Sequence, residues 1–178
     1  MKYLLNFWPE IKQKIPDAKL IVTGSYALWG TSDEENARIF QDIYKKASYL
    51  KDVSILQRLS KNKLAKLQAE SELMLYPTDF NEMFCISALE CLSVGTPVIS
   101  SARAAMNERI RDSFNGFLIA GKCNSLAYRK KIIKNTCDFL ISKKNKKSFS
   151  KNSIASVSKM GFAELAKEWE LEFIKRLK

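Results

Sequence analysis

The chain has 178 residues, of which 46% are hydrophobic, so it can bury a core and form one domain of ordinary size. It contains four cysteines and no histidine, which excludes zinc sites of mixed Cys/His type and nucleophilic triads that depend on histidine. No segment reaches about 18 consecutive apolar residues, so no membrane-spanning helix is expected, and the start of the chain does not resemble a signal peptide. We therefore expect a cytoplasmic protein whose cysteines are reduced thiols.

The net charge of +11 is concentrated in one segment of the chain. Residues 122–151 contain ten basic residues and a single acid, for a local charge of +9. Three interpretations are open: a solvated surface, a surface that rests on an anionic membrane, where each basic residue can add about 1 kcal/mol, or a nucleic-acid footprint. Aromatic side chains are sparse among these lysines, which argues against stacking on nucleic-acid bases, so we expect no nucleic-acid partner.

Helical and extended patterns alternate from the start of the chain. Apolar residues from Leu4 to Ile15 have helical spacing, although Pro9 predicts a kink or two shorter pieces. Residues 19–23 then form a short apolar run that predicts a strand ending at Gly24. A helix through residues 39–47, a strand at 53–56 and a helix that begins near Ser60 follow.

The second half of the chain continues the same alternation. The predicted strands are residues 73–76, 98–100 and 117–119, with a helix through residues 88–94 between the first two and three helical stretches after the last. Strands that alternate with helices predict a single doubly wound parallel sheet flanked by helices on both faces, in one domain over residues 1–178. Ligands of such sheets bind outside the carboxyl ends of the strands. Three loops with polar or glycine residues converge there, at Gly24, Gln57-Arg58 and residues 77–83.

Two carboxylates follow the third predicted strand, eight positions apart. Glu82 falls in the loop, and Glu90 falls about two turns into the next helix, so they can reach different parts of one ligand. The helix start between them offers free backbone N–H groups and a positive dipole end, which can hold a diphosphate without a dedicated lysine. The structural alternatives are a helix-capping role for Glu82 and an exposed i,i+4 contact for Glu90.

The stretch from Pro77 to Val98 resembles the E-x₇-E signature of retaining glycosyltransferases with the GT-B fold, in the large family 4 group. The resemblance extends to the turn Gly95-Thr96-Pro97-Val98, to Glu108 ahead of Asn115-Gly116, to the opening Trp8-Pro9-Glu10-Ile11 and to the segment from Glu164 to Trp169. It covers nearly the whole chain but only the carboxy-terminal, donor-binding domain of the family, a Rossmann-like sheet. The first strand of that domain and the acceptor-binding domain would then be missing from the chain.

The resemblance implies a role for each residue of the candidate site. Glu82 would be the catalytic residue, which contacts hydroxyls of the transferred sugar as positive charge grows at its anomeric carbon. Glu90 would accept hydrogen bonds from the ribose hydroxyls. The remaining donor-binding residues would be the backbone at Met83, Phe84, Cys85 and Ile86, together with Arg58 near the base and Gly24, which is equally consistent with a plain turn. No metal or other cofactor is implied.

The implied reaction transfers a hexose from a nucleoside diphosphate sugar to an acceptor hydroxyl with retention, in polysaccharide or glycoconjugate biosynthesis. The helix at residues 160–178 would pack toward a missing or separately encoded acceptor-binding domain, and the chain alone would be inactive. Peripheral contact with an anionic membrane is a further expectation. The alternative is a non-catalytic nucleotide-binding or interaction remnant of such an enzyme.

Overall fold

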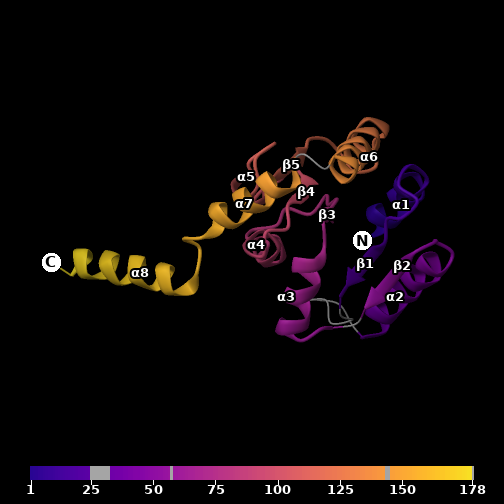
Figure 1. Cartoon of the computed structure of the whole chain (residues 1–178). Coiled ribbons are helices and arrows are strands. Elements are labelled where there is room, and N and C mark those ends of the chain that lie inside the picture. Colours follow the sequence, from indigo (N-terminus) through magenta and orange to yellow (C-terminus); the bar gives the residue numbers. More distant parts are fainter. Residues whose placement is uncertain (25–32, 57, 143–144, 178) are drawn as a thin grey trace.

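The parallel strands alternate with helices, as the sequence predicts (Figure 1). The computed structural model describes residues 1–24, 33–56, 58–142 and 145–177. The elements are α1 (Lys2–Lys14), β1 (Leu20–Thr23), α2 (Asp33–Ser48), β2 (Val53–Leu56), α3 (Lys61–Glu70), β3 (Met74–Tyr76), α4 (Ile86–Ser93), β4 (Val98–Ser101), α5 (Met106–Arg109), β5 (Gly116–Ile119), α6 (Leu126–Ile141), α7 (Lys146–Val157) and α8 (Phe162–Arg176). Every predicted strand is confirmed to within one or two residues, whereas the short helix α5 was not predicted.

Helix α1 runs through Pro9 as one continuous α-helix, so the sequence alternative of two pieces is wrong. Proline removes one intrahelical hydrogen bond, but the helix is fixed by tertiary contacts on both sides of that position. Phe7, Trp8 and Ile11 are buried in the core, and the Trp8 indole Nε1 donates to the Lys51 carbonyl oxygen at 2.8 Å. Packing of this apolar face therefore outweighs the local effect of the proline.

The strands form two hydrogen-bonded sections, and all of the pairs are parallel. The first section pairs β1 with β2, in the register Leu20 to Val53, and the second has the order β3–β4–β5, with Met74 opposite Val98. The fold class is confirmed, with one difference from the expected single sheet. Within the described part of the chain no strand lies between β1 and β3, so their facing edges lack the hydrogen bonds that would join the two sections.

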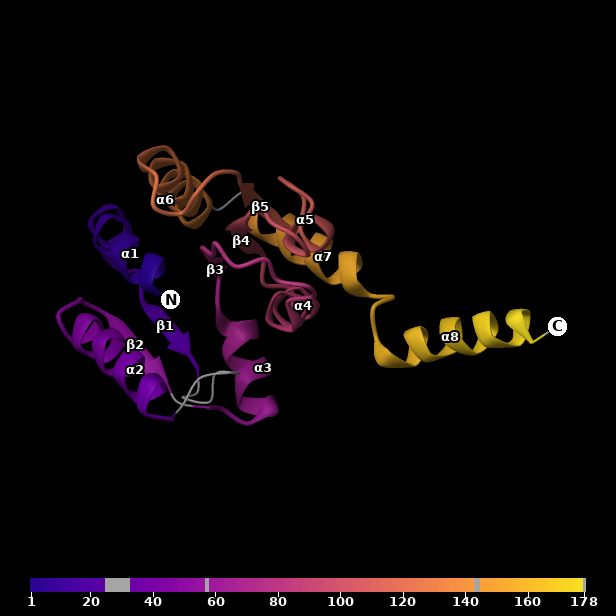
Figure 2. The same ribbon diagram turned by 180° about the vertical axis from the view of Figure 1, so that it is seen from behind.

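Helices cover both faces of the strands in three layers (Figures 1 and 2). Helix α1 contacts α2 and α6 on one face, and α4 contacts α3 and α7 on the other. The central strand β4 is buried at all four residues. Its Ile99 belongs to the hydrophobic cluster that includes α1 and α6, and Val98 belongs to the cluster around α4. Alternate residues of β4 thus pack into the hydrophobic clusters on the two faces of the sheet, as expected for a doubly wound domain.

Two glycines allow the close packing around β4. Gly95, in the turn before that strand, has φ +86°, and a Cβ there would lie 2.5 Å from Ser150 Oγ. A Cβ on Gly116 would lie 2.0 Å from the Val98 carbonyl oxygen, because Gly116 lies opposite Val98 in the parallel pair of β5 with β4. Both positions need a residue without a side chain.

The last helix projects away from the body of the domain in both views (Figures 1 and 2). None of its residues is buried, although it carries large apolar side chains such as Trp169 and Phe173. Its predicted contact with another domain therefore stays a prediction. No helix in the described ranges combines the length and apolar character needed to cross a membrane.

Candidate functional site

The candidate site lies along the carboxyl ends of the strands, where Tyr76 ends β3 and Ser101 ends β4. The strand order reverses between β1 and β3, and doubly wound sheets bind ligands at such a reversal. The Thr78 backbone N–H donates to Ser101 Oγ at 2.9 Å, which ties the loop after β3 to the end of β4. The segment that carries Glu82 is therefore anchored to the best-packed strand of the domain.

Two strained loops meet at Glu82. Cys85, directly before α4, has φ +53°, and Ala104 has φ +40°, both in the left-handed region that favours glycine. The Ala105 backbone N–H donates to the Glu82 carbonyl oxygen at 3.0 Å, which joins the two loops. Strained backbone of this kind clusters at functional sites and persists because the surrounding structure holds it.

Tyr76 fixes the carboxylate of Glu82. The Tyr76 hydroxyl donates to Glu82 Oε1 at 2.6 Å. Burial, and then the hydrogen bond to Glu82, raise the pKa of Tyr76 well above its ordinary value, so the hydroxyl remains a donor at neutral pH. Glu82 is also one of the residues that line a cavity at this rim. The N-cap position of α4 is Cys85, so the capping alternative for Glu82 has no support from a side-chain cap bond in the structure.

A cavity of about 660 Å³ opens beside this carboxylate. It is lined by Tyr76, Phe80, Glu82, Met83, Phe84, Cys85, Ile86 and Ser87. Helix α4 begins here, so its first backbone N–H groups and positive dipole end face the cavity. The Arg109 guanidinium lies 4.4 Å from the centre of the Phe84 ring and adds a positive charge to the same loop. The cavity can therefore hold an anionic group next to a carboxylate that accepts hydrogen bonds.

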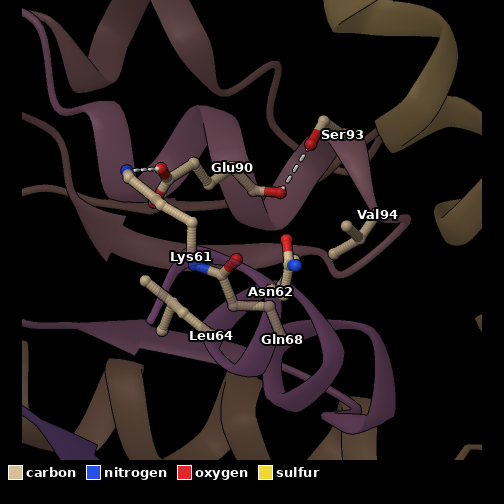
Figure 3. A pocket seen from close by; sticks show the side chains of 8 residues that line it. Lys61, Asn62, Leu64, Gln68, Glu90, Ser93 and Val94 are labelled. Atoms are coloured by element: carbon tan, nitrogen blue, oxygen red, sulfur yellow. Dashed lines mark hydrogen bonds and ion pairs between the residues drawn. The ribbon is translucent and has the colours of Figure 1, made fainter. Parts of the chain in front are cut away.

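Glu90 lines a second, smaller pocket of about 210 Å³ between α3 and α4 (Figure 3). Its Oε1 is 2.6 Å from Lys61 Nζ, at the first residue of α3. The Glu90 side chain is 28% exposed, and its ion pair joins two helices rather than neighbouring turns of one helix. The i,i+4 alternative from the sequence therefore does not describe the contact that is present.

The structure thus brings some of the predicted site residues together and separates others. Glu82 and the residues from Met83 to Ile86 share the large cavity, and Glu90 lines the pocket next along α4. Arg58 is exposed on the loop between β2 and α3 and lines neither of these two pockets. Gly24 directly follows β1 and donates its N–H to the Leu56 carbonyl oxygen at 3.3 Å. Gln57 lies outside the described residues.

Sequence reasoning missed three residues that shape these pockets. Tyr76 holds Glu82, Lys61 pairs with Glu90, and Arg109 lies over Phe84. For Tyr76 a signal was present, because the last residue of a strand ends at the rim where ligands bind. No comparable signal marks Lys61 or Arg109, whose contacts join residues 29 and 25 positions apart.

The cysteines do not contribute a nucleophile to the site. All four are free and buried. Burial raises the pKa of the Cys91 thiol to about 12, and it also raises the pKa of Cys85. A thiol with a raised pKa is a poor nucleophile at neutral pH. The chemistry of this rim therefore depends on carboxylates, hydroxyls and backbone N–H groups.

Solved structures with the same architecture define the class of protein. The pneumococcal O-GlcNAc transferase GtfA in complex with UDP and GlcNAc matches with a TM-score of 0.74 at 15% identity, over 99% of this chain and 33% of that chain. Anabaena Alr3699/HepE in complex with UDP-glucose matches with a TM-score of 0.74 at 19% identity, over 98% of this chain and 45% of that chain. The fold is therefore the Rossmann-like α/β domain of GT-B glycosyltransferases.

The sequence gives the family directly. Residues 1–156 match the family described as glycosyl transferases group 1, and the chain belongs to this family. Among curated relatives, a D-inositol 3-phosphate glycosyltransferase of Mycobacterium sp. (strain KMS) is 26% identical over 108 residues, and one of Mycolicibacterium paratuberculosis is 29% identical over 109 residues. Each match covers 61% of this chain and 24% of the relative, so the chain spans about a quarter of the length of these relatives.

Proposed function

We propose that this chain is the donor-binding part of a retaining glycosyltransferase that transfers a hexose from a nucleoside diphosphate sugar to an acceptor hydroxyl. The observation that carries the proposal is the placement of Glu82 and Glu90 in two pockets along one helix, with the start of α4 at the larger one. The larger cavity has room for a sugar and a diphosphate. Solved structures of the same fold contain UDP with GlcNAc and UDP-glucose, which supports this class of ligand.

Each end of the donor then has its own contacts. Glu82, held by Tyr76, accepts hydrogen bonds from sugar hydroxyls and stabilises positive charge at the anomeric carbon. The backbone N–H groups from Met83 to Ile86 hold the diphosphate at the positive end of α4, so no metal ion is required. Glu90 accepts from the ribose hydroxyls after Lys61 moves aside or shares its carboxylate. Arg58 and Gly24 contribute on the side of the base.

The acceptor is bound by a different part of the enzyme, either elsewhere in a longer polypeptide or on a separate chain. Helix α8 packs against that part through its exposed apolar side chains, which include Trp169 and Phe173. The isolated 178-residue chain accordingly transfers no sugar, because catalysis needs both reactants held in position. Turnover by the purified chain above a Glu82→Ala control would contradict this. If no nucleoside diphosphate binds at all, the non-catalytic alternative replaces the proposal.

The experiment that tests the assignment compares the two acids by calorimetry, with UDP, GDP and ADP and their sugar derivatives as probes. Glu90→Ala should weaken binding of the nucleoside diphosphate and the nucleotide sugar alike, by about 1.5–3 kcal/mol for a lost charged hydrogen bond. Glu82→Ala should weaken only the nucleotide sugar, by about 1–3 kcal/mol. Equal losses for both ligands in Glu82→Ala would remove the sugar-facing role of this residue.

We also propose that the basic segment 122–151 rests on an anionic membrane surface. Its exposed lysines include Lys130, Lys131, Lys147 and Lys151, whereas Arg129 is paired with Glu10 at 2.6 Å. Replacing these four lysines by glutamine should abolish binding to phosphatidylserine vesicles at low salt. Binding of the unaltered chain should weaken near physiological salt, where the screening length is about 8 Å. Absence of vesicle binding at low salt would leave a solvated surface.

A further inference from the structure

Arg103 lies in the loop between β4 and α5, at the carboxyl ends of the strands. Its backbone N–H donates to the Ser101 carbonyl oxygen at 2.9 Å, and its own carbonyl oxygen accepts from the Met106 N–H at 2.9 Å. Ser101 is the last residue of the buried strand β4, and Ala104, which directly follows Arg103, has φ +40°. The backbone at Arg103 is therefore held from both sides, so its side chain starts from a fixed point.

The segment that carries Arg103 contacts the loop with Glu82 at two points. The Ala105 backbone N–H donates to the Glu82 carbonyl oxygen at 3.0 Å. The Arg103 Nη2 atom lies 3.4 Å from Oδ1 of Asp79, which precedes Glu82 in the same loop. The guanidinium therefore lies against the part of the loop that leads to the Glu82 carboxylate.

The Arg103 guanidinium has few partners for a side chain that is only 30% exposed. Its Nε is buried and has no hydrogen-bond acceptor among the described residues. Nη1 also has no acceptor in the described part of the chain, but it is accessible to solvent. Arg129 provides a contrast, because its Nε and its Nη2 both lie 2.6 Å from the Glu10 carboxylate. Buried polar groups of native proteins are almost always hydrogen-bonded, so the open donors of Arg103 favour an oxyanion that approaches the Nη end.

The Asp79 carboxylate does not saturate this guanidinium. The distance of 3.4 Å to Nη2 is longer than the roughly 2.7–2.9 Å of charge-assisted hydrogen bonds. Asp79 also accepts from the Cys123 backbone N–H at 3.2 Å and from the Tyr3 hydroxyl. Asp79 therefore holds the guanidinium in place but leaves its Nη1–Nη2 edge open. That edge can form two parallel hydrogen bonds with a planar oxyanion.

The position of Arg103 along the loop indicates which part of a nucleotide sugar it meets. The start of α4 is the proposed diphosphate site, and Glu82, the proposed sugar contact, lies between that start and Asp79 in the loop. Arg103 is not among the residues that line the large cavity. It therefore meets only a substituent that projects past Glu82, on the side of the sugar remote from the diphosphate. In a hexose joined to phosphate through C1, that side includes C6, which is a planar carboxylate when it is oxidised.

We propose that the donor sugar is a hexuronic acid and that Arg103 binds its C6 carboxylate beside Glu82. This inference rests on the proposed function, because it needs a nucleotide sugar in the large cavity. Nη1 and Nη2 donate to the two carboxylate oxygens, while the second N–H of Nη2 stays with Asp79. Arg103 thereby distinguishes an acidic sugar from a neutral one, because a C6 hydroxyl leaves the charge of the guanidinium unpaired.

Calorimetry with UDP-glucose and UDP-glucuronate tests the proposal, because these two ligands differ only at C6. The unaltered chain should bind UDP-glucuronate at least about tenfold more tightly, as expected for a charge-assisted pair. Arg103→Met should reduce this preference to about twofold or less, and Arg103→Lys, which keeps the charge without the planar fork, should retain part of it. The ratio of the two affinities is the readout, so a general loss of binding in a variant cancels.

The matched control is Arg111→Met, which removes the same charge from the neighbouring segment. Arg111 is exposed, and its guanidinium lies 4.8 Å from the centre of the Phe114 ring. This variant should keep the full preference. Equal losses in Arg103→Met and Arg111→Met would instead show that the basic chain as a whole attracts the extra charge. That result would overturn the proposal, as would a preference that survives in Arg103→Met or is absent from the unaltered chain.

Nuclear magnetic resonance of the Arg103 Nε–H separates failure of this proposal from failure of the proposed function. The resonance is identified by its loss in Arg103→Lys. Glucuronic acid 1-phosphate should shift it, and glucose 1-phosphate should not. If this shift occurs although neither UDP nor GDP ligands bind, the nucleotide assignment is wrong and the assignment of Arg103 stands. Absence of both the shift and the preference, whether or not UDP binds, would leave Arg103 as only a partner of Asp79 and overturn the proposal.

Discussion

The two sections of the sheet differ in how well they are packed. In the β3–β4–β5 section the central strand is fully buried and serves a hydrophobic cluster on each face. In the β1–β2 section every second residue is exposed, and Val22 is the one buried strand residue among those described. Glu82 and Glu90 follow the well-packed section, whereas Gly24 and Arg58 follow the other one.

The well-packed section holds the candidate site in place. The loop with Glu82 is tied to β4 through Ser101 and to the following loop through Ala105. The loop with Glu82 is therefore positioned by the best-packed part of the domain. Contacts from the β1–β2 section depend on strands that are mostly half-buried or exposed. We expect sugar and diphosphate binding to depend less on the first section than recognition of the base.

The largest expected effect comes from truncating one isoleucine in each section. Ile99→Ala in β4 removes a side chain with 0% exposure and should lower the free energy of unfolding by about 2–5 kcal/mol. Ile21→Ala in β1 removes a 43% exposed side chain and should cost about 0.5 kcal/mol or less. Urea unfolding followed by circular dichroism measures both. Equal losses would mean that the two sections are packed alike in solution.

Two glycine-to-alanine substitutions, one in each section, compare how closely the backbone of the two sections is packed. Gly116→Ala brings a Cβ within 2.0 Å of the Val98 carbonyl oxygen and should destabilise the fold by about 1–3 kcal/mol. Gly24→Ala meets only the flexible Met1 side chain at 3.6 Å and should be tolerated. Thermal unfolding reports both effects. If Gly24→Ala keeps its stability but loses nucleotide affinity, Gly24 contacts the donor; unchanged affinity would leave Gly24 as a plain turn residue.

A smaller loss, in ligand affinity, is expected from a change at Tyr76, the last residue of β3. Tyr76→Phe removes the hydroxyl that holds Glu82 and should weaken binding of the nucleotide sugar by about 0.5–1.5 kcal/mol, the usual range for one hydrogen bond. Binding of the free nucleoside diphosphate should not change. Calorimetry with both ligands separates the two cases. A loss that is equal for both would show that Tyr76 supports the cavity as a whole rather than Glu82.

The smallest effect concerns acid stability of the rim. A hydrogen bond from Tyr3, and then one from the Cys123 backbone N–H, hold the pKa of Asp79 below its ordinary value. A depressed carboxyl pKa stabilises the folded state above the unfolded-state pKa, and this contribution is lost as pH falls through the folded-state value. Asp79→Asn should therefore be less stable than the unaltered chain at pH 7, with the difference shrinking below about pH 4. A difference that stays constant with pH would contradict this role.

The alternation of elements and the positions of the two acids can be predicted from local sequence patterns. Short apolar runs ending at Gly24, Leu56 and Tyr76 predicted the strands because strand formation depends on local apolar patterning and on nearby turn residues. The pattern from Pro77 to Val98 predicted a loop acid and a helix acid, and the structure places Glu82 and Glu90 there. These features depend on residues close together in the chain, so a sequence reading can reach them.

Contacts between residues far apart in the chain depend on how the elements pack. The pairing of Lys61 with Glu90, the approach of Arg109 to Phe84 and the continuity of α1 through Pro9 all depend on packing between separate elements. The division of the sheet also has no local signal, since an apolar strand has the same pattern whether its edge is paired or open. The pattern of apolar and polar side chains indicates which face of a strand is buried. Whether the backbone of that strand is hydrogen-bonded depends instead on which strand is its neighbour in the folded domain.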